Sequence, residues 1–407
     1  MEKLQSKKQI NLMAWLFAVT YLISYMTRIN YGAIIAEMET ATSFSRTLLS
    51  MALTGSFITY GIGQIIVGFL GDKFPPKRLI SLGLIVTIIM NILIVLCKNP
   101  YQMCAVWCVN GFAQSFMWPP MVKMLTVNLT MEDYKNVATK VSWGSSFGSI
   151  AVYLFSPIII SLTGNWKFVF VVSAVCGLIM LFAWEKLCVF DVKNIKTEST
   201  AEVSEKGNIK HLFTPMMLFI MLAVITQGML RDGVQTWMPS FIAETYGLSN
   251  EISILTGVVL PIFTIICLTL AKKLYQKQFT NPITCAAVFF IVGTLSALVI
   301  YTLNGLGAVF AVGGAAVLTG SMHGVNLMLI CMVPAFFGKY GISSFASGVI
   351  NACTYIGSAI SSYGIAILSE KMGWSFTVLS WVMIAFIGAM ICLSTKNSWA
   401  KKFGTNS

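Results

Sequence analysis

Apolar stretches long enough to cross a membrane follow one another along almost the whole chain. A membrane-spanning helix needs about 20 apolar residues, and the 407 residues contain twelve such stretches. Only 10% of the residues are charged, against roughly 25% in a soluble chain. A water-exposed surface cannot be built from so few charges. The sequence therefore predicts a polytopic membrane protein and excludes a soluble enzyme, a disordered chain and a nucleic-acid-binding protein.

The twelve predicted spans leave room only for short connections. Their approximate boundaries are 11–36, 47–71, 79–97, 101–127, 137–163, 166–190, 211–238, 250–271, 281–303, 306–335, 344–369 and 373–394. The one long polar stretch, residues 191–210, separates the sixth span from the seventh. We interpret it as a cytoplasmic linker between an N-terminal six-helix bundle, residues 1–190, and a C-terminal one, residues 211–407. The expected fold is an all-α membrane protein with twelve transmembrane helices.

The basic residues are sorted among the connections, which predicts the orientation. The chain has 27 Lys and Arg against 15 Asp and Glu, a net charge of +12. With both termini in the cytoplasm, 20 of the 27 lie on the cytoplasmic side, four outside and three within spans. Cytoplasmic loops carry such an excess of Lys and Arg. We expect a multi-pass protein of the cell membrane, with both ends inside and its basic loops in contact with anionic lipid.

Two pairs of landmarks recur at nearly equal distances along the chain. Arg28 and Arg231 are 203 residues apart, and each lies in the first span of its half. Trp166 and Trp374 are 208 residues apart, and each opens the last span of its half. Parallel repeats of this kind build the major facilitator transporters, which hold their substrate near mid-membrane between the repeats. The offsets therefore predict two pseudo-symmetric six-helix bundles, the major facilitator fold.

Arg28 and Arg231 are the principal candidates for a substrate site. An Arg in mid-membrane costs at least ~2.5–3.5 kcal/mol, so it faces an aqueous cavity or a partner. A two-fold axis would bring both side chains to one cavity, where two guanidinium forks can bind a phosphate or carboxylate. The alternative is that each Arg pairs within its own bundle. Asp232 is the nearby acid, but adjacent side chains on a helix diverge by about 100°.

Lys123 and His323 lie within spans, and each has two interpretations. The step from Trp118 to Pro120 removes backbone donors and is predicted to kink or break the fourth span. Lys123 then lies near the cytoplasmic end of this span, where it either lines the entrance of the cavity or snorkels to the interface. His323 lies in the tenth span, as either a proton relay or a hydrogen-bonded core residue.

A subset of the aromatic residues has helical spacing around the first arginine. Tyr21, Tyr25 and Arg28 lie on one face at intervals of four and three residues. Tyr60 and Gln64 form a second pair, four residues apart, in the second span. A tyrosine offers a hydroxyl and an apolar ring, which suits the hydroxyl groups of an organic anion. Packing between helices is the alternative interpretation.

The connection after the second span has the pattern G-x-x-x-D-K followed by further basic residues, from Gly68 to Arg78. It resembles the signature loop of the major facilitator superfamily. In that family the Asp and the basic residues cap neighbouring helix ends and latch the outward-facing state. The resemblance implies a gating role for Asp72, Lys73 and Arg78.

Four segments carry a narrower resemblance. They are YLISYMTRINY around Arg28, GFAQSFMWPP around Trp118, MLRDGVQTWMPSFIAE around Arg231 and NACTYIGSAI around Tyr355. They resemble the organophosphate:phosphate antiporter family, whose members exchange glycerol 3-phosphate or hexose 6-phosphate for inorganic phosphate. The resemblance covers nearly the whole chain and implies a phosphate held between the two arginines. The tyrosines that line the family's pore match Tyr21, Tyr25, Tyr60 and Tyr355.

Several positions depart from that family's pattern. Gln64 stands where the phosphate exchangers have a cavity Lys, Ile29 where a Lys follows the first-span Arg, and Ser145 where the fifth span has a His. Lys123 replaces an Arg, which is a milder change. With up to three fewer basic groups, the cavity suits a singly charged carboxylate or a phosphodiester better than divalent phosphate.

The first hypothesis is a secondary transporter that works by alternating access and exchanges a phosphorylated sugar or polyol for inorganic phosphate. The alternative is a proton-coupled symporter of a sugar acid or other carboxylate, with Asp232 or His323 as the proton carrier. A transport-inactive sensor of sugar phosphate is the third hypothesis. The chain lacks G-x-x-x-x-G-K-[ST] and any metal-ligand or nucleophile–base pattern. We therefore expect no enzyme, no cofactor and no bound metal, and a monomer.

Overall fold

The computed structural model describes residues 6–42, 44, 46–190, 209–248, 256, 258–303 and 307–404. Helices make up nearly all of these residues, and no strand occurs among them. The chain divides into two compact units, Met1–Asn208 with Phe337–Ala352 and Ile209–Phe336 with Cys353–Ser407. Residues 191–208 of the predicted linker lie outside the described residues. The predicted bundles, 1–190 and 211–407, therefore stay a prediction.

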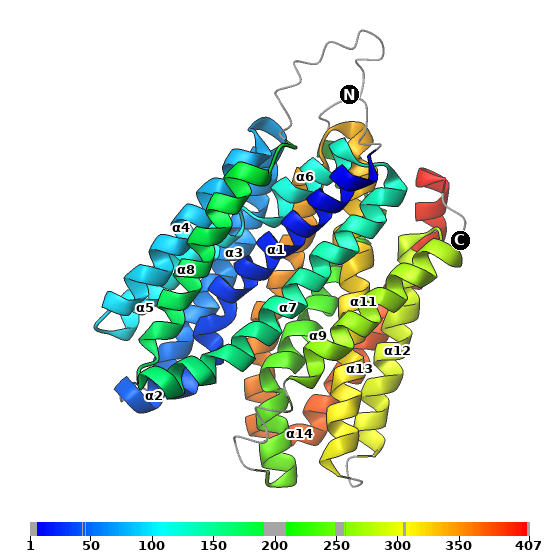
Figure 1. The fold of residues 1–407 in the computed structure, drawn as a ribbon. Coiled ribbons are helices and arrows are strands. Elements are labelled where there is room, and N and C mark those ends of the chain that lie inside the picture. Colours follow the sequence, from blue (N-terminus) through cyan, green and yellow to red (C-terminus); the bar gives the residue numbers. More distant parts are fainter. Residues whose placement is uncertain are drawn as a thin grey trace. The chain divides into compact units, whose positions relative to one another are not determined.

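The helices of the first unit pack side by side along much of their length (Figure 1). They are α1 (Lys7–Ala33), α2 (Ile35–Thr42), α3 (Arg46–Lys73), α4 (Pro76–Leu96), α5 (Pro100–Gln114), α6 (Trp118–Asn128), α7 (Met131–Thr163) and α8 (Lys167–Leu187). The second unit contains α9 (Pro215–Tyr246), α11 (Val259–Lys277), α12 (Pro282–Thr302), α13 (Ala308–Asn326) and the π-helical segment Leu327–Met332. The last helix, α14 (Ser343–Phe403), begins in the first unit and continues in the second.

Eleven helices in the described part are long and apolar enough to cross a membrane. They correspond, with shifted boundaries, to eleven of the twelve predicted spans. The last two of them, Ser343–Ser369 and Lys371–Phe403, both belong to α14. The backbone of α14 leaves the helical region at Gly373, where φ is 78°. The remaining predicted span, 101–127, is helical but divided into α5 and α6.

The division between α5 and α6 confirms the predicted effect of Trp118–Pro120. The backbone N–H groups of residues 115–117 donate to carbonyls only three residues back, at 3.1–3.2 Å. The two prolines then occupy the first turn of α6, where a missing N–H costs nothing. The fourth span is therefore two helices, and Lys123 belongs to the second of them.

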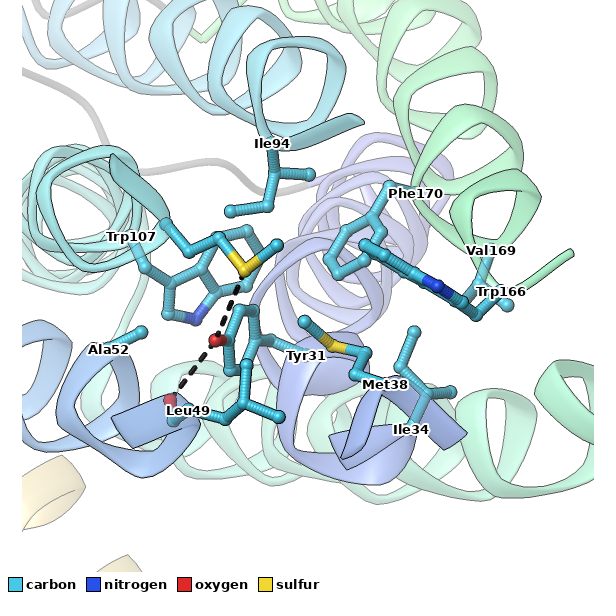
Figure 2. Packing of buried hydrophobic residues seen from close by; sticks show 11 residues of the cluster. Tyr31, Ile34, Met38, Leu49, Ala52, Ile94, Trp107, Trp166, Val169 and Phe170 are labelled. Carbon is cyan, nitrogen blue, oxygen red and sulfur yellow. Dashed lines mark hydrogen bonds between the residues drawn. The ribbon is translucent and has the colours of Figure 1, made fainter. Parts of the chain in front are cut away.

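An apolar cluster ties one end of α1 to α3, α4, α5 and α8 (Figure 2). Tyr31 of α1 is fully buried in it, with its ring 5.2 Å from that of Trp107 and 6.2 Å from that of Phe170. Its hydroxyl donates to the carbonyl of Leu49 at 3.0 Å. This cluster fixes α1 at a point three residues beyond Arg28.

Two glycines of α7 let that helix pack directly against α1. A Cβ atom at Gly148 would lie 2.5 Å from the carbonyl oxygen of Leu22 and 2.8 Å from Cβ of Tyr25. At Gly144 it would collide with the carbonyl of Ala18. Helices in a membrane associate through such close packing of small residues, since lipid is as apolar as their side chains.

We therefore expect Gly148→Ala to lower the melting temperature of the purified protein. The added methyl group overpacks the contact with α1, which typically costs about 1–3 kcal/mol. Gly313→Ala is the matched control, because an added Cβ there meets nothing within 4 Å. A scanning-fluorescence melt compares the two variants, and equal melting temperatures would contradict the close-packing account.

Candidate substrate site

Arg28 lies among tyrosines of two helices in the first unit. Its guanidinium carbon is 4.3 Å from the ring centre of Tyr25 on α1 and 4.8 Å from that of Tyr60 on α3. The ring of Tyr21 lies 5.2 Å from that of Tyr25 and 5.4 Å from that of Trp118. A guanidinium that stacks on aromatic faces keeps its N–H donors in its own plane. The structure thus brings together Arg28 and the three tyrosines predicted around it.

Gln64 is fully buried on α3, one turn from Tyr60. Its Oε1 accepts a hydrogen bond from Asn351 Nδ2 at 3.0 Å, and its Nε2 lies 3.5 Å from the carbonyl of Ser115. Ser145 is buried on α7, where its hydroxyl donates to the carbonyl of Ser142 at 2.7 Å. These two predicted site residues are thus engaged with neighbouring protein groups, and their contact with a substrate stays a prediction.

Asp72, at the end of α3, joins two other elements of the first unit. Its Oδ1 and Oδ2 accept from the backbone N–H groups of Ser344 and Phe345 at 3.2 and 2.8 Å. The first turn of a helix favours a negative charge, and these two N–H groups belong to the first turn of α14. Lys123 Nζ forms an ion pair with Asp72 Oδ1 at 3.2 Å. The two roles expected for Lys123, lining the entrance of the cavity or snorkelling to the interface, stay predictions.

The two basic residues predicted to act with Asp72 are both exposed. Lys73 Nζ lies 3.9 Å from the ring centre of Phe69, and Arg78 lies in the first turn of α4. Lys77, for which the sequence predicted no role, pairs with Glu185 of α8 at 3.5 Å. A gating role for Asp72, Lys73 and Arg78 stays a prediction.

Arg231 of α9 is 6% exposed and is paired with its neighbour in sequence. Its Nε donates to Asp232 Oδ1 at 2.7 Å, and its Nη2 donates to Asp232 Oδ2 at 2.8 Å. Oδ2 also accepts a hydrogen bond from the hydroxyl of Ser358 on α14. The carboxylate thus occupies a guanidinium edge with the bidentate geometry that a substrate anion would use.

This pairing corrects the expectation that Asp232 points away from Arg231. The Cα–Cβ bonds of adjacent residues do diverge around a helix. The arginine side chain is long and flexible enough to fold back along the helix surface and reach the carboxylate. A buried Arg without a counter-charge is costly, so this arrangement is favoured. Arg231 therefore forms an ion pair within its own unit, which was the alternative to a substrate site.

Two further predicted residues lie near this pair. The guanidinium carbon of Arg231 is 5.9 Å from the ring centre of Tyr355 on α14, which is 6% exposed. His323 of α13 is close enough to interact electrostatically with both Arg231 and Asp232. His323 lies four residues before the π-helical segment, and such segments often mark functional sites. Arg231, Asp232, His323 and Tyr355 thus form one group in the second unit.

The sequence and the fold match known proteins over nearly the whole chain. Residues 17–362 match the profile of the Major Facilitator Superfamily. A solved structure of the proton:xylose symporter XylE, bound to 6-bromo-6-deoxy-D-glucose, superimposes with a TM-score of 0.76 at 13% identity. The match covers 97% of this chain and 96% of the symporter. At that identity the structural match concerns the fold alone.

Three relatives match at low identity, and two of them are named for the transport of organic phosphates. A probable hexose phosphate transport protein of Chlamydia muridarum is 22% identical over 93% of this chain and 89% of its own. The glycerol-3-phosphate transporter of Bacillus subtilis is 24% identical over 82% of this chain and 83% of its own. The membrane sensor protein UhpC of Salmonella typhimurium is 21% identical over 97% of this chain and 93% of its own.

These relatives are consistent with the resemblance to the organophosphate:phosphate antiporter family. They are transporters or sensors rather than enzymes, and the helices have the number and apolarity of a multi-pass membrane protein. The profile match extends over most of the chain. The chain belongs to the major facilitator superfamily of membrane transporters.

Proposed function

We propose that this transporter moves small organic anions by alternating access, with a phosphorylated sugar or polyol exchanged for inorganic phosphate. The anionic group is bound by Arg28 and Arg231. The tyrosines beside these arginines contact the rest of the substrate. The protein is a monomer in the cell membrane, with both termini in the cytoplasm.

The observation that carries this proposal is that each unit places one arginine of its first span near tyrosine rings. Arg28 lies over Tyr25 and Tyr60, and Arg231 lies near Tyr355. The two arginines occupy equivalent places in the first and seventh predicted spans. A guanidinium held by aromatic rings in a membrane suits a phosphate or carboxylate ligand. The names of the hexose phosphate and glycerol-3-phosphate relatives support phosphate esters as the substrate class.

The pairing of Arg231 with Asp232 favours a second candidate, proton-coupled uptake of an organic acid. An anion that takes both edges of the Arg231 fork must displace the carboxylate of Asp232. Protonation of Asp232 would remove the competing charge and release Arg231. Proton entry and anion binding would then be coupled at one side chain, with His323 as the other titratable group nearby.

Transport by purified protein in liposomes distinguishes these functions. Vesicles are filled with phosphate, or with sulfate as the control, and uptake of labelled glucose 6-phosphate and glycerol 3-phosphate is followed. A trapped pH-sensitive dye records proton movement when a sugar acid such as glucuronate is added.

We expect uptake of phosphate esters that requires internal phosphate and leaves the dye unchanged. Acidification with the sugar acid, and no phosphate exchange, would replace the first function by the second. Saturable binding of a phosphate ester without uptake in either assay would identify a sensor, as the name of UhpC suggests for that relative.

A further inference from the structure

A buried network of amides and hydroxyls connects α1 to α4, α5 and α8 in the first unit. Its members are at most 3% exposed. They are Ser24, Thr27, Asn30, Thr87, Asn91, Asn110, Gln114 and Ser173. Neutral polar side chains in a membrane span mark contacts between helices, because hydrocarbon offers them no partner.

The network concentrates on one turn of α1. The carbonyl oxygen of Thr27 accepts from Asn91 Nδ2 at 3.0 Å and from Asn110 Nδ2 at 3.1 Å. The hydroxyl of Thr27 accepts from Gln114 Nε2 at 3.0 Å. Two helices, α4 and α5, thus hold the residue that immediately precedes Arg28.

The residues one turn to either side of Thr27 are also held by Gln114 and Asn91, and one of them by Ser173 as well. The hydroxyl of Ser24 donates to Gln114 Oε1 at 2.5 Å. Asn30 Nδ2 donates to Asn91 Oδ1 at 2.8 Å and to the hydroxyl of Ser173 on α8 at 3.1 Å. In the described part of the chain Asn110 Oδ1 has no hydrogen-bond partner. The Asn110 side chain is therefore hydrogen-bonded to α1 only.

The network and the arginine occupy different faces of α1. At 100° per residue, the face of Ser24, Thr27 and Asn30 is centred about 120° from the face of Tyr21, Tyr25 and Arg28. The rotation of α1 about its axis therefore decides where the guanidinium lies. Hydrogen bonds at fixed positions specify this rotation, in addition to the packing of α1 against α7 and in the cluster around Tyr31.

We infer that Asn91, Asn110 and Gln114 are positioning residues, which fix the rotation of α1 and so direct Arg28 toward the substrate. This inference rests on the proposed function for its consequence in transport. The network acts on the binding of the anion and not on the crossing of the loaded carrier, because its bonds join helices of one unit.

The test compares Asn91→Leu with wild type. Leucine has a similar size and removes both bonds to α1, so we expect the KM for glucose 6-phosphate to rise about tenfold, equivalent to about 1.4 kcal/mol. The maximal rate should stay within twofold. Thr20→Val is the control, because among the described residues the buried hydroxyl of Thr20 bonds only to the carbonyl of Leu16 in its own helix.

A second readout does not depend on transport. Phenylglyoxal modifies arginines, and mass spectrometry follows its rate at each one. We expect Asn91→Leu to change the rate of modification of Arg28 at least threefold and to leave the rate of modification of Arg231 unchanged. Thr20→Val should change neither rate. If Asn91→Leu does not fold, Thr27→Val is expected to give the same changes at smaller size. Between helices it loses only the bond from Gln114; its other hydroxyl bonds are to the carbonyls of Ile23 and Ser24 in its own helix.

Unchanged KM and unchanged labelling of Arg28 in a folded variant would overturn the inference. Equal changes at Arg28 and Arg231, or a loss confined to the maximal rate, would also overturn it. If wild type transports none of the tested anions, the proposed function fails. The labelling then still decides whether the network directs Arg28.

Discussion

Replacing Arg28 or Arg231 with Lys is expected to lower uptake of phosphate esters about 10- to 100-fold, although the charge is kept. Lysine is a point charge and cannot bind an anion through two parallel N–H groups. Each lost charge-assisted hydrogen bond costs about 1.5–3 kcal/mol. Initial rates of uptake into phosphate-loaded liposomes, normalised to the amount of reconstituted protein, measure the effect.

Arg46→Lys is the control for this pair of substitutions, because Arg46 precedes the membrane-spanning part of α3. Its uptake should equal that of wild type. Wild-type uptake in both Arg28→Lys and Arg231→Lys would refute the role of the two arginines. Loss in only one of them would assign the anion to that arginine alone.

Replacing Asp232 with Asn is expected to tighten the binding of inorganic phosphate about tenfold, which corresponds to about 1.4 kcal/mol. In wild type the anion must displace a carboxylate that holds Arg231 by two hydrogen bonds. Asparagine has the same shape but no charge, so the competition is much weaker. Binding to the purified protein is measured by isothermal titration calorimetry at constant pH.

Ser358→Ala is the matched variant for Asp232→Asn. It removes one hydrogen bond to the carboxylate and keeps the ion pair with Arg231. Its effect on phosphate binding should be small. Weaker binding in Asp232→Asn would contradict competition and would mean that Asp232 orients Arg231 for the anion.

The sequence predicted the parts of this structure that depend on local spacing. Apolar length identified the spans, and the prolines after Trp118 identified the break between α5 and α6. Helical spacing placed Tyr25 and Arg28 on one face, where they are in contact. Tyr60 could be placed beside them only through the resemblance to a known family.

Pairings between distant segments were not predicted. Lys123 and Asp72 are 51 positions apart, and Asp72 and Phe345 are 273 apart. No periodicity within a helix encodes such contacts, which depend on how the helices pack. The ion pair of Arg231 with Asp232 was discounted for a different reason, since the average direction of a side chain does not describe a long, flexible one.

The buried amides were also missed, although the sequence carries a signal for them. Asn91 and Asn110 lie inside apolar spans, where an unpaired amide is costly. Charge and aromatic spacing, on which the predicted site depends, give these amides no role. A polar residue in a span predicts a partner on another helix, but it does not identify that partner.

A structure of the protein with a bound phosphate ester tests the central claim most directly. Cryo-electron microscopy of the purified protein in excess glycerol 3-phosphate provides it. We predict that the phosphate oxygens accept hydrogen bonds from both Arg28 and Arg231, and that Arg231 has left Asp232. A phosphate group bound away from these two arginines, with the pair of Arg231 and Asp232 intact, would contradict the account.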